Sequence, residues 1–453
     1  MRVLIGPVEI AGVAQGLSQG LRALGVGADL VLESEHPFAY GGAEAGSIVV
    51  RAWRFTGTRY RRLPMGRWWL RIPLAVLHLA LGWVVLAWAL PRYSDFVFIA
   101  GKSLTGTAVD LMLMRALRKH VAVIYVGSDS RPPYINGAWP SGSVAAVARQ
   151  TRRLNSIAAL ARQTRRLKSK VARTERWASV CVNAPGTAHF HERPVVNWFA
   201  LGCPRSLARP AQPRAPPPPG DGSAVRRVTL LHSPSVPVVK GTELIRAAVE
   251  RLQRRGHPID LVLMQGMRND EVLEAIRRCD LVVDQMYSDT PMAGLAFEAA
   301  LLSKPALVAG YFAPHAAQTL AGQPIPPTRF VHPGDFERTL EELVCDASAR
   351  EALGAAARHF VDTHWRCEQV ARRMIRILRG DIPESWMFDP RAVRYLEGCG
   401  LHEDAARERV RRLIEHAGPA ALCLADKPEL QQAFVDWAGA RAPEDAHFDR
   451  AVP

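Results

Sequence analysis

Short apolar runs alternate with amphipathic stretches in the second half of the chain. The runs predict buried strands at 228–231, 259–264, 280–284 and 306–310. Helical patterns at 242–252 and 293–303 lie among them. Parallel strands need helical crossovers that cover both faces of the sheet, so this alternation predicts a doubly wound α/β domain. Ligands bind such sheets beyond the carboxyl ends of the strands, which makes 232–240, 265–269 and 285–294 the loops of interest.

The first half of the chain shows the same alternation. Its apolar runs predict buried strands at 2–5, 28–33, 95–103, 120–126 and 179–183. A helical pattern at 13–24 connects the first two of these strands. The sequence therefore predicts two Rossmann-like, doubly wound parallel-sheet domains.

A Pro-rich segment, 204–224, separates the two halves. It ends in APPPPGDG, a composition that is typical of a linker. The predicted organisation is an N-terminal domain at 1–203 and a C-terminal domain at 225–380, whose last helix is a candidate to cross back towards the first domain. The remaining residues, 381–453, are predicted to form a helical extension.

Candidate chemistry follows the first strand of the second half. Lys240 can reach a diphosphate as a point charge, and Gly241 opens a helix whose free N–H groups and dipole favour an anion. Glu298 lies one turn inside the helix at 293–303, where its carboxylate can accept two hydrogen bonds from a ribose. Gly12 precedes the helix at 13–24 and allows a phosphate to approach its N-terminus closely. Each residue alone also fits an ordinary helix start, a turn or a surface carboxylate.

Two stretches resemble the donor-binding half of the GT-B glycosyltransferases of the retaining family 4 group. HSPSVPVVKGTELIRAAVERL, which begins at His232, is similar to the segment that carries a Lys-Gly pair in that group. DLVVDQMYSDTPMAGLAFEAALLSKPALV is similar to the region of the motif EGFGLxxxEAxxxGKP. Glu298-Ala299 and Lys304-Pro305 match the end of that motif.

The sequence departs from the family pattern at two places. Thr290 stands where the motif has its first Glu, and Val236 or Val238 stands where a basic residue commonly precedes the Lys-Gly pair. These departures leave two alternatives. One is an active glycosyltransferase, and the other is a catalytically silent relative that binds a sugar nucleotide or a glycan.

The resemblance implies a GT-B fold, two Rossmann-like domains that face a cleft. It also implies transfer of a hexose from a nucleoside diphosphate sugar to a hydroxyl of a glycan or lipid-linked acceptor, with retention and without a metal or other cofactor. Lys240 would neutralise the diphosphate and Glu298 would hold ribose or sugar hydroxyls. Gly12, Gly241 and Gly294 would lie beside the donor. Such catalysis is mostly positioning and electrostatic stabilisation.

The strand at 120–126 ends in the polar sequence GSDSRPP. Similar enzymes have a loop of the type GSDxR here, so the resemblance makes Asp129 and Arg131 candidates for the acceptor hydroxyl and for a phosphate or acidic group. Asp129 is then, with Glu298, a candidate for catalysis. The alternative is an Asx turn with a surface Asp–Arg pair.

The segment 72–90 holds no charged residue and, with about 18 apolar residues, reaches the length of a transmembrane helix. A span is not expected, because the next segment, 95–103, is predicted to be a buried strand. Two alternatives stay open, a helix packed in the core and a helix seated in a membrane interface. Nearby Trp and Arg side chains have the character of interfacial segments. They are Trp68, Trp69, Trp83, Trp88, Arg51, Arg54, Arg59, Arg61, Arg62, Arg67 and Arg71.

A basic helix is predicted at 149–176, where ARQTRRL occurs twice, beginning at Ala148 and at Ala161. It fits a solvated face or a contact with an anionic surface. The net charge of +15 favours a polyanionic partner in general. Nucleic acid is not expected, because the sequence has no zinc-finger, RNA-recognition or basic-zipper signature. A GxGxxG motif followed by a ribose-binding acid is also missing, which argues against NAD.

The seven cysteines form no CxxC pair, so the sequence indicates neither a disulfide framework nor a zinc site. The N-terminal MRVLIG is predicted to be a strand and lacks the order of regions in a signal peptide. We therefore expect a cytoplasmic protein, with peripheral attachment to the inner face of the cell membrane as a further possibility.

Overall fold

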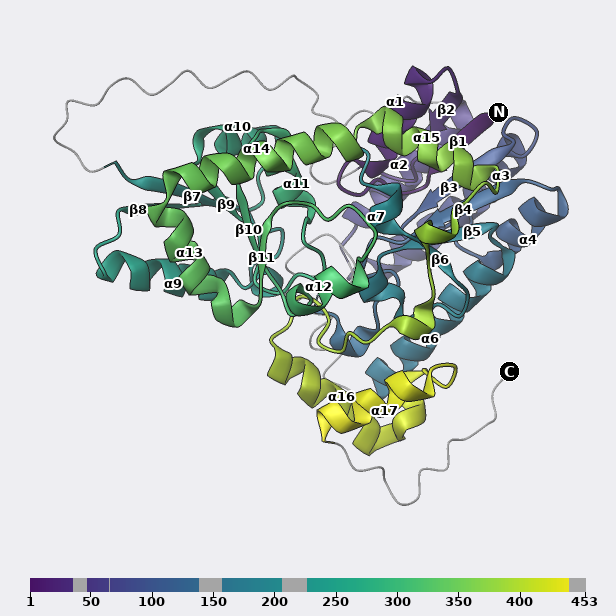
Figure 1. Cartoon of the computed structure of the whole chain (residues 1–453). Helices are drawn as coiled ribbons and strands as arrows, with labels where there is room; N and C mark the ends of the chain where they lie inside the picture. Colours follow the sequence, from purple (N-terminus) through teal and green to yellow (C-terminus); the bar gives the residue numbers. More distant parts are fainter. Residues whose placement is uncertain (36–46, 65, 138–156, 206–225, 440–453) are drawn as a thin grey trace.

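Two parallel sheets lie side by side in the computed structural model, which describes residues 1–35, 47–64, 66–137, 157–205 and 226–439 (Figure 1). The strands of the first sheet, in spatial order, are β12 (Met387–Phe388), β6 (Val195–Asn197), β5 (Val180–Asn183), β4 (His120–Ile124), β3 (Asp95–Ile99), β1 (Arg2–Gly6) and β2 (Gly27–Leu30). Those of the second are β11 (Arg329–Val331), β10 (Ala306–Ala309), β9 (Leu281–Val283), β7 (Val228–His232) and β8 (Ile259–Leu263).

All strand pairs are parallel except β12 with β6. The predicted fold class, two Rossmann-like domains of the GT-B type with a helical C-terminal extension, is confirmed by these sheets. Apolar runs without alternation form the strands because both faces of each sheet are covered by helices.

The helices of the second domain surround its sheet. They are α8 (Pro237–Lys240), α9 (Thr242–Arg254), α10 (Asn269–Arg278), α11 (Gly294–Leu301), α12 (Ala313–Thr319), α13 (Phe336–Cys345) and α14 (Ala347–His364). One hydrophobic core joins them to the strands, with Leu230 and Val282 of the sheet packed among Ile245, Ala299 and Leu340. The predicted helices at 242–252 and 293–303 are present with boundaries shifted by about two residues.

The first domain has helices on both sheet faces. α1 (Val13–Ala23) and α15 (Cys367–Leu378) cover one face, where Val3 and Val97 pack against Met374. The other face is covered by α2 (Ile48–Arg62), α3 (Trp68–Ala89), α4 (Ala108–Ala116) and α6 (Ile157–Trp177), and a short helix α7 (Trp198–Leu201) follows β6. α14 and α15 run across the top of Figure 1 from the second domain to the first, so α15 does cross back.

Most of the C-terminal extension lies below both domains in Figure 1, but its first part supplies β12, a strand that the sequence did not predict, to the edge of the first sheet. Its helices α16 (Glu403–Ala417) and α17 (Pro428–Ala438) pack on the first domain, where the ring of Phe434 lies 5.4 Å from that of Tyr134. The extension also contacts the second domain, because Gly400 N donates to Tyr287 O at 3.0 Å. This segment therefore holds the two domains together.

α3 is the helix whose environment the sequence left open. Core packing is correct only for its C-terminal part, where Gly82, Val85, Leu86 and Ala89 are buried. The remaining apolar side chains are mostly exposed, with Trp68 at 65%. It is also the helix, within the described part of the chain, that is long and apolar enough to cross a membrane, by length and composition alone.

Two predicted features fall partly outside the described residues. α6 begins at Ile157, so the start of the basic helix at Arg149 and the first copy of ARQTRRL cannot be placed. Most of the predicted linker, 206–224, also lies outside the described ranges.

Candidate functional site

Lys240 and Gly241 lie at the carboxyl end of the second sheet, between α8 and α9. Lys240 is the last residue of the short helix α8, which the sequence did not predict and which begins with Pro237 at its first position. Its Nζ donates to Gln285 Oε1 at 2.6 Å and lies 3.8 Å from Asp284 Oδ1. Gly241 has a φ of 70°, and a Cβ there would come within 2.6 Å of the Cβ of Met286. The turn therefore requires glycine at this position.

His232 is a site residue that the sequence reasoning missed. It is fully buried at the end of β7, where its ring nitrogens lie 2.8 Å from Val283 O and 2.9 Å from Thr242 Oγ1. The carbonyl can only accept, so Nδ1 donates to it and Nε2 accepts from the Thr242 hydroxyl. Burial lowers the pKa of His232, which keeps the ring neutral. The residue thus joins the ends of β7 and β9 to the start of α9.

Glu298 lies on α11 and is buried, at 3% exposure, so the surface-carboxylate alternative is wrong. Its carboxylate pairs with the Arg205 guanidinium and accepts from Asn269 Nδ2 at 2.5 Å. Burial raises the pKa of Glu298, and the positive charge of Arg205 opposes that rise. Arg205 is the second residue of the predicted linker, 204–224, and is buried, so this ion pair ties the end of the first domain to the second. Only its basic side chain at the start of the Pro-rich segment could have pointed to it in the sequence.

Gly12 lies beneath the same arginine. It adopts a φ of 79° at the start of α1, and a Cβ there would lie 3.3 Å from Arg205 Nε. The N–H groups of Ala14 and Gln15, which Gly12 was predicted to open to a phosphate, instead donate to the Glu9 carboxylate at 3.3 and 2.9 Å. Burial raises the pKa of Glu9 to about 7. The anion position at this helix is therefore taken by a side chain of the protein.

Gly294 opens α11 and faces the loop that contains Gly12. A Cβ built on Gly294 would lie 3.9 Å from the Cβ of Ala11, and Gly294 O accepts from Arg205 Nη1 at 3.3 Å. Two residues further, Ala296 N donates to Asp284 Oδ2 at 3.3 Å. Asp284 therefore connects the first turn of α11 with Lys240. The structure brings Gly12, Gly241, Gly294, Lys240 and Glu298 to one region between the domains.

Asp129 and Arg131 are held by structural contacts. Both carboxylate oxygens of Asp129 accept from Val126 N, at 3.0 and 3.1 Å. The donor lies three residues before Asp129, whereas an Asx turn would use the N–H two residues after it, so this contact is not the predicted Asx turn. Arg131 is buried, and its Nε donates to Asp289 Oδ2 at 2.9 Å. A surface pair of Asp129 with Arg131 is therefore wrong, because Arg131 pairs with an acid of the second domain. That acid directly precedes Thr290, the position where the motif departs from its family.

No protein-family model matches the chain, and no curated protein matches it. Solved structures align over most of its length. The Anabaena protein Alr3699/HepE in complex with UDP aligns with 84% of this chain and 100% of its own, at 12% identity and a TM-score of 0.42. For the spinosyn rhamnosyltransferase SpnG complexed with thymidine diphosphate the values are 83%, 100%, 14% and 0.38. For MnaA of S. aureus with UDP they are 84%, 96%, 12% and 0.41. Likenesses this low carry no conclusion about function, and the fold class follows from the sheets described above.

Proposed function

We propose that this protein is a glycosyltransferase that moves a hexose from a nucleoside diphosphate sugar to a hydroxyl of a glycan or lipid-linked acceptor, with retention. The observation that carries the proposal is the meeting of Lys240, the start of α9 and Glu298 at the carboxyl ends of one parallel sheet. A diphosphate leaving group needs a cation and helix N–H groups, and a sugar needs carboxylate acceptors.

Arg205 would supply a second cation for the diphosphate. The family pattern has a basic residue before the Lys-Gly pair, where this chain has Val236 or Val238, and Val238 is 83% exposed. Arg205 reaches the region between Gly12 and Gly294 from the start of the predicted linker instead. Its ion pair with Glu298 then holds the carboxylate in place until a donor with hydroxyl groups competes for it.

Asp129 and Arg131 would act on the acceptor only indirectly in this proposal. Both side chains are engaged with the protein, so they fix the loop 127–131 at the carboxyl end of β4. The acceptor hydroxyl would approach from this loop, on the side of the first domain. They are therefore positioning residues in the proposal.

The test is an assay of turnover on a panel of nucleoside diphosphate sugars. It measures release of the nucleoside diphosphate and transfer of the sugar to glycan and lipid-linked hydroxyl acceptors. Release or transfer with at least one donor supports the enzyme. Binding of a donor without any turnover would favour the silent relative, which the threonine at position 290 motivates. Absence of binding to every nucleotide would overturn both.

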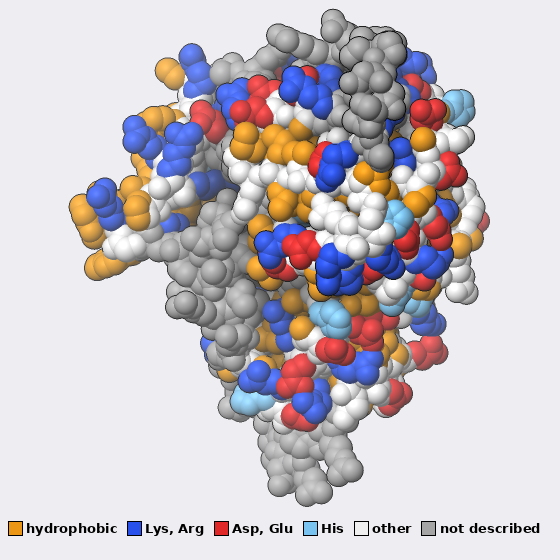
Figure 2. All heavy atoms as spheres, turned by 90° about the vertical axis from the view of Figure 1, so that its left-hand side faces the viewer, with side chains coloured by type: hydrophobic (Ala, Val, Ile, Leu, Met, Phe, Trp, Pro, Cys, Tyr) orange, Lys and Arg blue, Asp and Glu red, His pale blue; other side chains and the backbone are white. Residues whose placement is uncertain are grey.

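We further propose that α2 and α3 seat the protein in the interface of an anionic membrane on the cytoplasmic side. The exposed apolar residues of α3 recur at helical spacing, as Trp68, Ile72, Val76, Leu79 and Trp83 do. α2 and α3 lie at the back of Figure 1, which is the left side of Figure 2. The lobe that projects there in Figure 2 carries hydrophobic and basic side chains together. Such a combination suits an interface, where apolar groups insert and cations meet lipid phosphates.

A further inference from the structure

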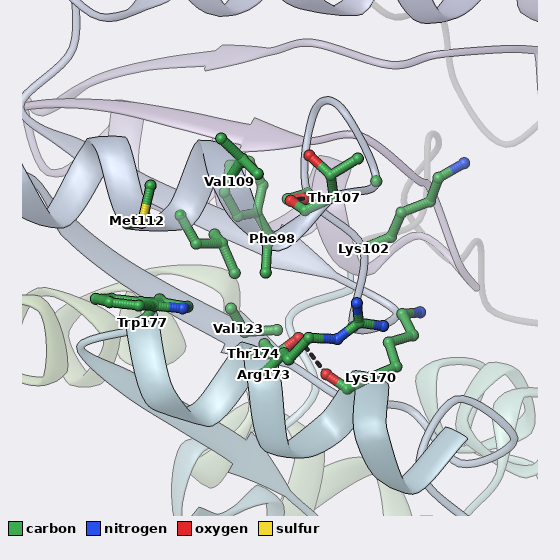
Figure 3. Close-up of a pocket in the computed structure, with 15 residues that line it drawn as sticks. Phe98, Lys102, Thr107, Val109, Met112, Val123, Lys170, Arg173, Thr174 and Trp177 are labelled. Carbon is green, nitrogen blue, oxygen red and sulfur yellow. Dashed lines mark hydrogen bonds between the residues drawn. The ribbon is translucent and has the colours of Figure 1, made fainter. Parts of the chain in front are cut away.

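A separate pocket lies in the first domain, between α4, α6 and the loop that connects β3 with α4 (Figure 3). Phe98 and Val123 of the sheet line it from behind. Figure 3 shows Trp177 and Met112 towards one end, and Lys102 with Arg173 and Lys170 towards the other. The pocket therefore has an apolar end and a cationic end.

The lining residues of the pocket include three basic side chains and no acidic one, within the part of the chain that the structure describes. Lys102 Nζ pairs with Glu33, an acid outside the lining that also binds Arg61 at 2.5 Å. Burial lowers the pKa of Lys170, the negative charge of Asp129 opposes that fall, and repulsion by Lys102 adds to it. Glu33 already neutralises Lys102, so the cations that face the pocket are Lys170 and Arg173, which lie one helical turn apart on α6. A bound anion would stabilise these two like charges.

The apolar end is also open to a ligand. Val109 and Met112 of α4 are 49% and 43% exposed, and they flank the pocket opposite Trp177. Exposed apolar side chains beside a row of cations fit a molecule that carries both kinds of surface. A free inorganic anion would use only the cationic end.

We propose that this pocket binds an amphiphilic phosphate, with its phosphate held by Lys170 and Arg173 and its apolar chain lying along Val109, Met112 and Trp177. Phosphate oxygens accept charge-assisted hydrogen bonds from lysine and arginine, and the chain would cover the apolar end. The proposal stands beside the proposed sugar transfer and does not depend on it, because the pocket shares no residue with the donor site.

The location of the pocket is consistent with a ligand that comes from a membrane. A Cβ built on Gly82 of α3 would lie 3.0 Å from Leu104 O, so the loop at the rim of the pocket rests on α3. On the other side, Val123 of β4 lines the pocket, and the loop 127–131 follows the same strand. The pocket lies between the exposed apolar helix and the loop assigned to the acceptor side.

The experiment is a titration of the full-length protein with octyl phosphate, kept below the concentration at which octyl phosphate forms micelles. Tryptophan fluorescence measures binding. We expect a saturable change that the variant Trp177→Phe loses. Lys170→Gln and Arg173→Gln should each weaken binding by about tenfold or more. Arg166→Gln, which removes the same charge from an exposed position of α6 outside the pocket, should leave binding unchanged.

Inorganic phosphate and octyl glucoside separate the two halves of the ligand. Neither should compete with octyl phosphate at equal concentration. If inorganic phosphate competes as well as octyl phosphate itself, the pocket is a simple anion site. If octyl glucoside does so, the pocket is an apolar site. Either result overturns the proposal. Unchanged affinity in both Lys170→Gln and Arg173→Gln also overturns it.

Two controls separate loss of the pocket from loss of the fold or of nucleotide binding. Arg173 is exposed, so Arg173→Gln tests the pocket even if Lys170→Gln fails to fold. Calorimetry with UDP and other nucleoside diphosphates should give the same affinity in the pocket variants as in the unchanged protein. If the unchanged protein binds no nucleotide, the proposed sugar transfer is overturned and the pocket proposal still stands.

Discussion

At the scale of single residues, the site is built from charges that already have partners. Lys240 bonds to Gln285 and lies near Asp284, and Glu298 pairs with Arg205. A ligand therefore has to exchange contacts with the protein rather than fill free groups. Such exchange makes the effect of each substitution depend on the partner that it leaves behind.

Lys240→Ala should weaken binding of a nucleoside diphosphate by roughly tenfold to a hundredfold. The reason is that a charge-assisted contact to phosphate contributes about 1.5–3 kcal/mol. Isothermal titration calorimetry measures the affinity. The control is Arg246→Ala, which removes a cation from an exposed ion pair on α9. Equal affinity of the Lys240 variant and the unchanged protein would exclude Lys240 from the site.

Glu298→Gln should lower the free energy of unfolding by about 3–5 kcal/mol, because it removes one charge of the buried ion pair with Arg205. The double variant Glu298→Gln with Arg205→Gln should lose less stability than the sum of the two single variants. Urea unfolding of all four proteins measures this coupling. Additive losses would show that the ion pair contributes nothing beyond its separate side chains.

At the scale of elements, the start of α1 shows how a helix end can be closed from within. The Glu9 carboxylate accepts from the N–H groups of the first turn, where the dipole of the helix favours a negative charge. Burial works in the opposite direction and raises the pKa of Glu9 to about 7 from an ordinary 4.5. The charged and neutral forms are therefore balanced near neutral pH.

Glu9→Gln should change how stability depends on pH. The folded protein holds a proton on Glu9 at pH values where the unfolded chain has released it, so the contribution of Glu9 is full below the unfolded pKa and is lost as pH rises through the folded one. Between about pH 4 and about pH 8 the unchanged protein should lose on the order of 3 kcal/mol relative to the variant. Urea unfolding of both proteins across this range measures the difference, and other titrating groups cancel in it. A difference that stays constant with pH would contradict the raised pKa.

At the scale of the whole molecule, two domains are held by contacts that cross between them. Arg131 with Asp289 and Arg205 with Glu298 join them through buried ion pairs. The C-terminal extension adds Gly400 to Tyr287, and α15 returns to the first sheet. These contacts leave α2 and α3 projecting at one side, and the charge of the chain is +15.

The proposed membrane face predicts co-sedimentation with anionic vesicles but not with neutral ones. Each basic residue near such a surface contributes about 1 kcal/mol, which salt screens, whereas inserted apolar side chains add a part that salt does not remove. Trp68→Ala with Trp69→Ala should abolish the salt-resistant part. Arg51→Gln with Arg59→Gln, on the exposed side of α2, should weaken the salt-sensitive part.

The control for the vesicle experiment is Val238→Ala with Leu244→Ala, which removes exposed apolar side chains of the second domain. This variant should sediment like the unchanged protein. Equal sedimentation with neutral and anionic vesicles, or none with either, would contradict the membrane face. The positive charge would then have to serve a soluble acidic acceptor.

The fold class and the location of Lys240, Gly241 and Glu298 could be predicted from the sequence alone. Apolar runs and helical spacing are local properties of the chain, and they predicted the strands β7 to β10 and the helices α9 and α11. The Lys-Gly pair and Glu298 lie at the strand ends because loops that follow parallel strands gather at one edge of the sheet.

The partners of these residues could not be predicted from the sequence, because they lie far away along the chain. Glu298 pairs with Arg205, 93 positions away, and Arg131 with Asp289, 158 positions away. Glu9 takes the helix end that Gly12 was expected to open, and most apolar side chains of α3 remain exposed. The period of a helix or strand shows which side chains share a face, but it does not show what that face meets. Burial, ion pairing and the pKa shifts that follow from them depend on segments that folding brings together from distant parts of the chain.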